Sequence, residues 1–415
     1  MSSFQPMSQT NKRPYATRWI LLLGLITALG PLSIDMYLPS LPVIADEFGV
    51  STSEVSHSVT AYFLGLVIGQ LIYGPLSDRI GRRNPLFIGL SLYLVASLLC
   101  LFADSVMTLN LARFVQALGG CAGVVIARAA IRDRLSNEQM SQAISMLILV
   151  MGVAPIVAPA LGNLVLIQFS WQVIFLVLAL FSVICLVWSY VDFEDTLPIE
   201  KRSTKPWSGV LGEYVELLKD KRFLLPAVAS GMLMGALFVY INASAELLID
   251  YFGLNSTWYS WVFGANAAGL IAMTQLSARL VTRFSVLKVF SAGVYLQVVS
   301  ASALLLCTLV GLNQLTVVVG LIFVLLSGIG LTAPNGTTLA LADQSERSGL
   351  ASSMLGALQF FIGALGSIVL HSFGGDLLTR FSIALWLMMS AGLALLVIYQ
   401  RQVRSLGSSV KTADS

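Results

Sequence analysis

The stretch 74–83, Gly-Pro-Leu-Ser-Asp-Arg-Ile-Gly-Arg-Arg, lies where two long apolar runs of this chain meet. The runs cover residues 56–76 and 85–104, and each has the length of about 20 residues that a helix needs to cross a bilayer. Glycine and proline turn the chain sharply, and clustered arginines resist transfer into lipid. The stretch therefore predicts a tight loop at a membrane surface, between two spanning helices.

The same pattern returns 200 residues later in the chain. Residues 76–80, Leu-Ser-Asp-Arg-Ile, correspond to residues 276–280, Leu-Ser-Ala-Arg-Leu, and Arg83 corresponds to Arg283. The second copy lacks the acid and the equivalent of Gly81. Each copy follows the second apolar run of its half, so the echo predicts two duplicated halves, a recurrent transporter architecture.

Composition places the whole chain in lipid. Charged residues make up 11% of the 415 residues, against roughly 25% in a soluble domain. Hydrophobic residues reach 57%, more than a soluble core of this size can bury. We predict an all-α membrane protein with twelve spanning helices, at 18–39, 56–76, 85–104, 107–130, 139–165, 171–191, 223–243, 258–279, 285–309, 315–339, 349–371 and 379–400.

The loops between these runs are asymmetric in charge. Nearly all Lys and Arg fall in alternate loops and at the two ends of the chain, and Arg380 is the one clear exception. Positively charged loops stay in the cytoplasm, so both termini are expected there. The polar stretch 192–222 divides a first six-helix bundle, 1–191, from a second, 223–415. We expect 192–222 to be a cytoplasmic loop between them.

Several classes of function find no support. The four cysteines lie far apart in apolar runs, and the two histidines have no neighbour at metal-ligand spacing, so no disulfide framework or metal site is expected. A net charge of +3 suggests no nucleic-acid partner. No phosphate-binding loop of the Gly-Lys-Ser/Thr type occurs, so no cofactor or ATPase is expected. Energy must come from an ion gradient or from the substrate.

Two charged residues lie inside predicted spans, Asp35 and Arg113. An ionised side chain at a helix centre costs roughly 2.5–3.5 kcal/mol on insertion scales, so neither is expected to face lipid. At about 1.5 Å per residue, both fall in the outer half of the membrane, where they could meet. They form either a proton-coupling pair or a static ion pair between helices. Glu246, near the outer end of the seventh span, is a further acid whose role stays open.

A substrate cavity at mid-depth would be lined from both halves. Aromatic and methionine side chains with few polar groups suit lipophilic ligands of varied shape. Each candidate could equally serve packing. The candidates are Tyr62, Gln116, Met151, Tyr240, Asn242, Asn335, Gln359 and Phe361.

Residues 74–83 resemble the signature loop between the second and third helices of the major facilitator superfamily. Residues 113–119, Arg-Phe-Val-Gln-Ala-Leu-Gly, resemble the helix-4 motif of its proton-coupled members. Residues 154–162, Ala-Pro-Ile-Val-Ala-Pro-Ala-Leu-Gly, are similar to the antiporter motif of drug exporters. Ala158 and Asn163 stand where that motif usually has glycine.

Two further stretches resemble the bicyclomycin-resistance (Bcr/CflA) family of drug–proton antiporters. They are residues 32–39, Leu-Ser-Ile-Asp-Met-Tyr-Leu-Pro, and 128–133, Arg-Ala-Ala-Ile-Arg-Asp. The resemblance implies a multidrug exporter of the bacterial inner membrane that exchanges protons for small lipophilic drug-like compounds. A monomer is expected. An exporter or symporter of a normal metabolite is the alternative, and a membrane-embedded enzyme or a sensor is a more distant one.

The resemblance also implies roles for single residues. Asp35 would bind the proton, with Arg113 as its charge partner. The antiporter motif would be carried by Pro155, Pro159 and Gly162. An inner gate, which breaks when the two halves rock, would be formed by Gly74, Asp78, Arg79, Gly81, Arg82 and Arg83. A basic loop that only sets orientation is the simpler interpretation of this last group.

Overall fold

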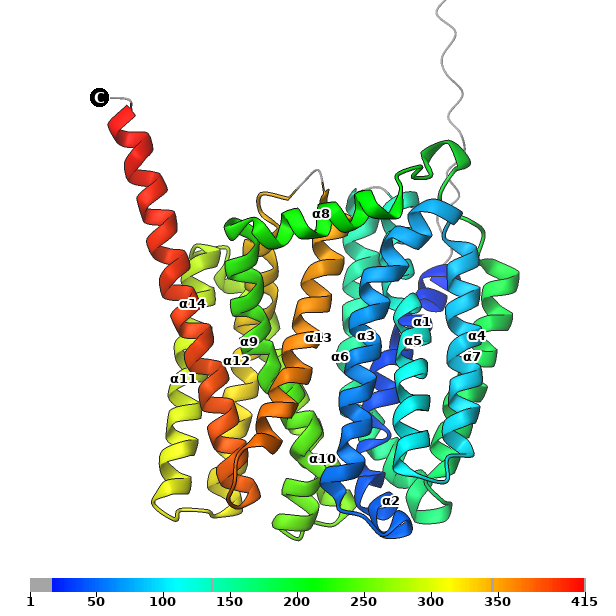
Figure 1. Ribbon diagram of the computed structural model, residues 1–415, viewed down its shortest axis with the longest axis vertical. Helices are drawn as coiled ribbons and strands as arrows, with labels where there is room; N and C mark the ends of the chain where they lie inside the picture. The colour runs from blue at the N-terminus through cyan, green and yellow to red at the C-terminus, as the bar shows by residue number, and fades with distance from the viewer. Residues whose placement is uncertain (1–16, 136, 345–346, 414–415) are drawn as a thin grey trace, which may run out of the picture.

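The computed structural model describes residues 17–135, 137–344 and 347–413. Within them every regular element is a helix, and the long helices run side by side in one bundle (Figure 1). Eleven helices in these ranges are long and apolar enough to cross a membrane. The remaining long helix is α10, which carries the polar residues Asn266, Thr274 and Gln275. The predicted all-α membrane fold is confirmed, and the twelve predicted spans each fall on a long helix.

The elements follow in two sets along the chain. The first set is α1 (Thr17–Asp35), η1 (Leu38–Ser40), α2 (Leu41–Phe48), α3 (Thr52–Ile80), α4 (Arg83–Leu101), α5 (Val106–Arg134), α6 (Asn137–Gln168) and α7 (Gln172–Asp192). The connection holds η2 (Ile199–Lys201) and α8 (Trp207–Lys219). The second set is α9 (Lys221–Ala245), the π-helical turn η3 (Glu246–Tyr251), α10 (Ser256–Leu280), α11 (Val286–Leu309), α12 (Leu315–Leu341), α13 (Ser348–Ser372) and α14 (Leu377–Ala413).

The first predicted span, 18–39, is wrong at its end. Helix α1 stops at Asp35, and a short η1 and α2 follow after a turn. Pro39 explains the stop, because it has no N–H to donate to the Asp35 carbonyl four residues earlier. Pro42 lies in the first turn of α2, where a missing N–H is tolerated. Asp35 is therefore the last residue of a broken helix and does not lie inside a continuous one.

The end of α3 also differs from the prediction. Gly74 and Pro75 were expected to end the second span, but the helix continues to Ile80 with Pro75 inside it. The chain turns at Gly81, where φ is +88°. Glycine adopts this left-handed region at little cost, whereas other residues are strained there. The turn of the motif is thus made by its second glycine.

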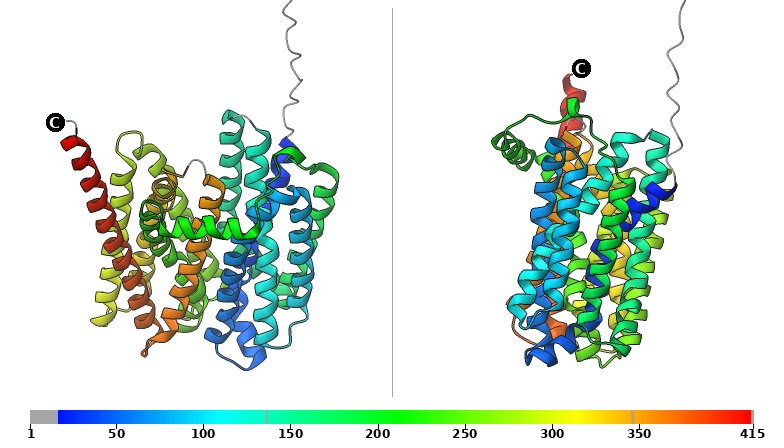
Figure 2. Two further views of the ribbon diagram at one scale, coloured as in Figure 1. Left: turned by 45° about the horizontal axis from the view of Figure 1, so that its top comes forward. Right: turned by 90° about the vertical axis from the view of Figure 1, so that its right-hand side faces the viewer.

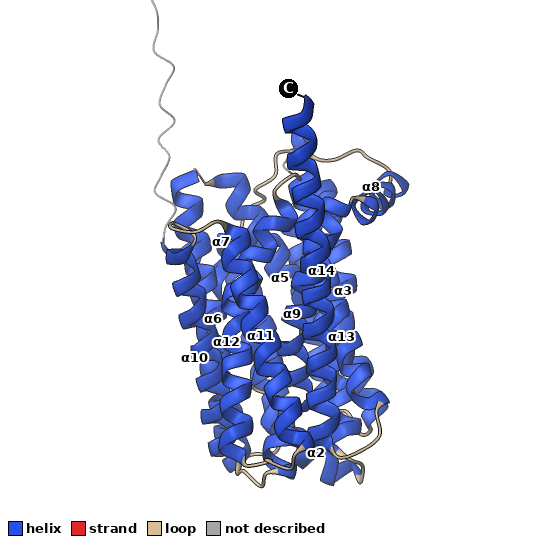
Figure 3. Ribbon diagram, turned by 90° about the vertical axis from the view of Figure 1, so that its left-hand side faces the viewer, coloured by secondary structure: helices blue, strands red, loops and turns tan. Residues whose placement is uncertain are grey.

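Each set of helices packs mainly on itself. The two sets meet where α3 contacts α13 and where α6 contacts α10. Helix α8 lies across one end of the bundle, on the same side as the chain's C-terminus, and α2 lies at the opposite end (Figures 1 and 3). We name these the α8 end and the α2 end. Figure 2 shows the same arrangement from two other sides.

The predicted loop 192–222 is partly helical and touches both sets. In α8 the Tyr214 hydroxyl donates to the carbonyl of Leu71 in α3 at 3.2 Å. Glu216, also in α8, accepts from Arg347 at 2.6 Å, just before α13. The connection is therefore a strap across the α8 end.

Candidate functional site

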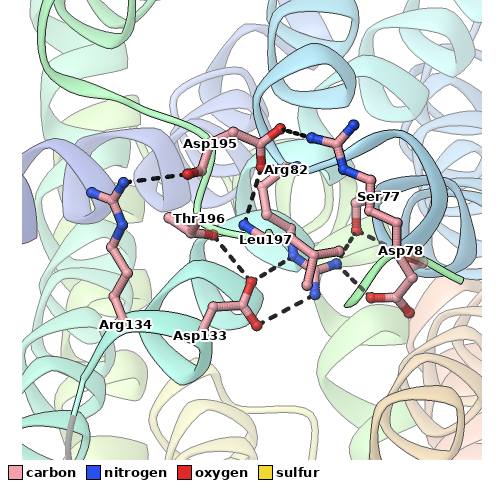
Figure 4. Close-up of polar contacts among 10 residues, drawn as sticks. Ser77, Asp78, Arg82, Asp133, Arg134, Asp195, Thr196 and Leu197 are labelled. Carbon is pink, nitrogen blue, oxygen red and sulfur yellow. Dashed lines mark hydrogen bonds and ion pairs between the residues drawn. The ribbon is translucent and has the colours of Figure 1, made fainter. Parts of the chain in front are cut away.

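Arg82 is the centre of a polar network at the α8 end (Figure 4). Its side chain is 3% exposed and donates to Asp78 at 2.6 Å and to Asp133 at 2.8 Å. It also donates to the Ser77 hydroxyl at 2.7 Å. Burial alone would lower the pKa of Arg82, but the bonds and charges of Asp133 and Asp78 outweigh it, so the pKa is raised. Arg82 is therefore a fixed cation held between two carboxylates.

Asp195 fastens the connection to this network. Its carboxylate accepts from the backbone N–H of Arg82 at 2.9 Å and from the Arg202 guanidinium at 3.0 Å. A Cβ atom on Gly81 would overlap the Asp195 carboxylate. The close approach of the connection to the turn thus requires glycine at 81 for space as well as for φ.

The residues predicted to form the inner gate lie close together. In this conformation their polar contacts are with residues of the first set of helices and of the connection between the two sets. Asp78 pairs with Arg82 of its own motif. The Arg79 guanidinium bonds the Lys205 carbonyl, and Arg83 donates to the Tyr190 carbonyl at 3.3 Å. Asp133 and Asp195, which complete the network, were missed as gate residues. Asp133 stood in a quoted motif, but nothing in the sequence tied Asp195 to Gly81.

A cavity of about 150 Å³ opens beside this network, between α3, α5 and α13. It is lined by parts of both sets: Gly74, Asp78 and Arg82 come from the motif, Arg128 and Arg132 from α5, and Ser352 and Ser353 from α13. None of the predicted cavity residues lines it. The halves thus enclose a polar space at the α8 end.

Arg113 occupies a closed aromatic pocket within the first set. Its side chain is fully buried, and the guanidinium carbon lies 4.3 Å from the ring centroid of Tyr62 and 4.7 Å from that of Tyr37. Its Nη1 donates to Gln116 Oε1 at 2.5 Å, and Gln116 in turn donates to the Ser97 hydroxyl at 2.8 Å. Cation–π contacts and this one charge-assisted bond hold the cation.

The expected ion pair between Asp35 and Arg113 is not present. Asp35 is 3% exposed, and among the described residues it has no hydrogen-bond or ion-pair partner. The physical reason is the break in α1, because it moves Asp35 to a helix end while the rings of Tyr37 and Tyr62 cover the Arg113 guanidinium. The two charges lie in the same region without touching.

Tyrosines from both halves lie in the neighbourhood of Asp35. Tyr62 of α3, Tyr240 of α9 and Tyr259 of α10 all lie within electrostatic range of its carboxyl group. Tyr240 accepts from the Asn266 side chain at 2.9 Å and stacks on Phe263. Tyr62 and Tyr240 were predicted to line a cavity, whereas Tyr259 and Asn266 were not found, because nothing in the sequence brings α10 to the end of α1.

The proline motif of α6 packs against the same break. A Cβ atom on Gly162 would overlap the backbone carbonyl of Met36, the residue after Asp35. On its other side the Pro159 carbonyl accepts from Ser260 of α10 at 3.2 Å, and Asn163 donates to Thr257 at 3.2 Å. Helix α6 therefore joins the Asp35 break to the second set.

Residues 23–370 match the model of one protein family, described as Major Facilitator Superfamily, and this range is most of the chain. The chain belongs to the major facilitator superfamily.

Relatives within the superfamily are similar along most of their length. The chain is 35% identical to an uncharacterized MFS-type transporter, YdgK, of Bacillus subtilis, over 83% of this chain and 86% of the relative. It is 29% identical to a bicyclomycin resistance protein homolog of Haemophilus influenzae, over 85% and 88%. It is 30% identical to the multidrug resistance protein MdtL of Klebsiella pneumoniae, over 83% and 86%.

Solved superfamily structures share the fold. A peptide transporter in complex with sulfate matches with a TM-score of 0.72 at 13% identity, covering 94% of this chain and 95% of that one. A D-xylose–proton symporter matches with a TM-score of 0.69 at 14% identity, covering 92% and 97%. The protein is thus a multi-pass membrane transporter of this superfamily, and not an enzyme.

Two predicted cavity residues hold the facilitator bundle together instead. Asn242 of α9 accepts from the Ser56 hydroxyl at 3.2 Å and donates to Thr60 at 2.9 Å, so it ties the halves at the α2 end. Asn335 of α12 donates to Ser277 of α10 at 2.8 Å, within the second half. Both amides are buried and use their hydrogen bonds inside the protein.

The remaining candidates lie elsewhere in the facilitator bundle. Phe361 is 44% exposed, and its neighbour Phe360 stacks on Phe63 of the other half instead. Successive residues of a helix point about 100° apart, so Phe360 faces the other half while Phe361 does not. Met151 and Gln359 are half-buried. Glu246 lies in η3, within electrostatic range of Arg380 at the α2 end.

Proposed function

We propose that this superfamily member is a proton-coupled exporter of small lipophilic drug-like compounds. It would exchange protons for substrate by alternating access, as a monomer in the bacterial inner membrane with both termini in the cytoplasm. The proton gradient would supply the energy, with no cofactor. The names of the Haemophilus and Klebsiella relatives support a role in drug resistance.

The buried, unpaired Asp35 carries the proposal. An ionised carboxylate without a partner is costly at membrane depth. At the last residue of α1 it would also face the negative end of the helix dipole. Both effects favour the neutral acid in this conformation. The other conformation would open Asp35 to the outside, where it would take up a proton, and the proton would be released to the cytoplasm when substrate enters from that side. Protons would then move inward as substrate moves outward, which is the requirement for coupling.

The surroundings of Asp35 suit lipophilic substrates. Tyr62, Tyr240, Tyr259 and Phe263 offer flat apolar surfaces, with hydroxyls as the few polar groups. Such surfaces bind compounds of varied shape. These side chains are buried in this conformation, so a substrate would reach them only when the rings part, and it would then compete with the proton at Asp35. This competition supports exchange over symport.

The packing of the halves supports alternating access. At the α2 end, Asn242 bonds Ser56 and Thr60, and the Ser53 hydroxyl lies 3.0 Å from His371 Nδ1. At the α8 end the halves enclose the polar cavity. Rocking about the contact regions would break the bonds at the α2 end and close the cavity. Since the Lys and Arg residues predict a cytoplasmic α8 end, the substrate would enter from the cytoplasm.

The test is transport by purified protein in proteoliposomes with an imposed pH gradient. A fluorescent pH indicator inside the vesicles reports proton movement on addition of each of a panel of antibiotics. Wild type is expected to move protons with at least one compound. Asp35→Asn should lose this movement but keep exchange of labelled for unlabelled compound, since exchange needs no net proton transfer.

The matched control is Asp104→Asn, which neutralises an exposed acid before α5 and should behave as wild type. The antiport proposal would be rejected by an Asp35→Asn protein that still accumulates compound against its gradient. It would also be rejected by the absence of substrate-dependent proton movement across the whole panel.

A further inference from the structure

Two arginines of α5 line the cavity at the α8 end. Arg128 and Arg132 are one helical turn apart and both border the cavity. Among the residues that the structure describes, neither has a hydrogen bond or an ion pair. Every other arginine of the neighbouring network, by contrast, is tied to a carboxylate or a carbonyl. The proposed proton coupling through Asp35 gives these two guanidiniums no role.

The charge of the cavity is positive after its acids are counted. Asp78 and Asp133 both bind Arg82, so that cluster carries one net negative charge. Arg128 and Arg132 carry two positive charges, which leaves an excess of one among the residues that the structure describes. Because guanidiniums carry five N–H donors in a fixed fork, two of them side by side present a surface suited to carboxylate or phosphate oxygens.

The start of α13 faces the same arginines. The Arg132 guanidinium lies about a van der Waals contact away from Gly349, where an added Cβ would be 3.7 Å from Nη1. The N-cap residue, Arg347, makes no side-chain cap, and its guanidinium is turned away to Glu216. Within the described part of the chain no side chain caps the N–H groups of the first turn, so they add positive potential, and Ser352 and Ser353 add hydroxyls to the lining.

The size of the cavity limits what it can hold. Drug-sized ligands need pockets of about 300–1,000 Å³. The space here is about 150 Å³, enough for an ionic group and a few further atoms. We propose that Arg128, Arg132 and the start of α13 form a binding site for a single anionic group, a carboxylate or a phosphate, at the α8 end of the transport path.

The group could belong to a solute that enters the cavity or to the headgroup of an anionic lipid. A basic helix end that only sets membrane orientation explains the charge but not the placement. Orientation needs positive charge in the loop, whereas Arg128 lies within α5, more than a turn before its end, and borders the cavity between the halves, where its side chain stays accessible to solvent.

The test is calorimetric titration of the full-length protein in a non-ionic detergent, with no pH gradient. The probes are benzoate and inorganic phosphate, and benzamide is the neutral match for benzoate. Wild type should bind benzoate at least about tenfold more tightly than benzamide, with affinity falling as salt rises. Arg128→Gln with Arg132→Gln should remove that preference, and Arg128→Lys with Arg132→Lys should keep part of it. Arg279→Gln, an exposed arginine outside the cavity at the same end, is the control.

Nanodiscs separate the two sources of the anion. If benzoate binds equally in phosphatidylcholine and phosphatidylglycerol discs, the site takes a solute. If phosphatidylglycerol weakens benzoate binding to wild type but not to the double Gln variant, the site binds the headgroup of an anionic lipid. Equal binding of benzoate and benzamide, or unchanged benzoate binding by the double Gln variant, would overturn the site. The titration needs no transport, so its result is independent of whether Asp35 couples to protons.

Discussion

The guanidinium carbon of Arg113 lies 4.3 Å from the ring centroid of Tyr62, and the buried Tyr62 hydroxyl has no hydrogen-bond partner among the residues that the structure describes. Tyr62 therefore contacts Arg113 through the face of its ring and not through its hydroxyl. In the same described ranges Arg113 Nε and Nη2 also lack partners, so the aromatic faces of Tyr37 and Tyr62 are the main compensation for the burial of Arg113. A cation–π contact contributes about 2 kcal/mol when it is desolvated.

The first prediction separates the ring of Tyr62 from its hydroxyl. Tyr62→Phe keeps the face over Arg113 and removes an unpaired polar atom, so stability should change by less than about 1 kcal/mol. Tyr62→Leu loses both the cation–π contact and ring packing and should destabilise by about 2–4 kcal/mol. Thermal unfolding in detergent measures both. Equal losses for the two variants would show that the hydroxyl matters after all.

The second prediction concerns the turn at Gly81. Gly81→Ala should cost roughly 1–2 kcal/mol for the left-handed backbone, plus the displacement of the Asp195 carboxylate that the new Cβ would overlap. Gly49→Ala is the control, since its φ is +67° but no atom lies within 4 Å of the added Cβ. Proteolysis of the connection 193–206 should therefore speed up in Gly81→Ala alone. Similar proteolysis of the two variants would mean that Asp195 does not hold the connection.

A third prediction concerns the contact between α6 and the break after Asp35. Gly162→Ala forces α6 away from the Met36 carbonyl, and should lower transport by about tenfold or more if a shift of about 1 Å disturbs the site. Gly152→Ala on the same helix meets the flexible end of Ile271 at 3.2 Å and should be close to wild type. Initial rates in proteoliposomes, corrected for the amount of folded protein, decide this. Full activity of Gly162→Ala would show that the contact is dispensable.

The fourth prediction concerns the lock at the α2 end. Asn242→Ala removes bonds to Ser56 and Thr60, each worth about 0.5–1.5 kcal/mol, and should shift the population toward opening at that end. Distances between spin labels on α3 and α13 at the α2 end should lengthen in part of the population. Asn335→Ala breaks a bond within one half and should leave these distances unchanged. A shift of equal size in both variants would indicate general loosening of the bundle.

The functional site was harder to predict than the helices, for a physical reason. Asp35 and Arg113 were found from the cost of a charge in lipid, a property of each residue by itself. The contact predicted between them is absent in this conformation, because the first helix breaks after Asp35. The role of Asn242 as a tie between halves, and the exposure of Phe361, depend on which neighbours the helix meets, and a single residue's type does not contain that information.

The sequence by itself determined the membrane class and the positions of the long helices. These follow from apolar length and from the placement of charge, both of which are local along the chain. Only the tertiary structure decided that α1 ends at Asp35, that tyrosines of both halves lie near this acid, and that the Asp195 carboxylate packs against Gly81. The same holds for Arg128 and Arg132, which face a cavity completed by α13. Such contacts join residues far apart in the chain, and only packing brings them together.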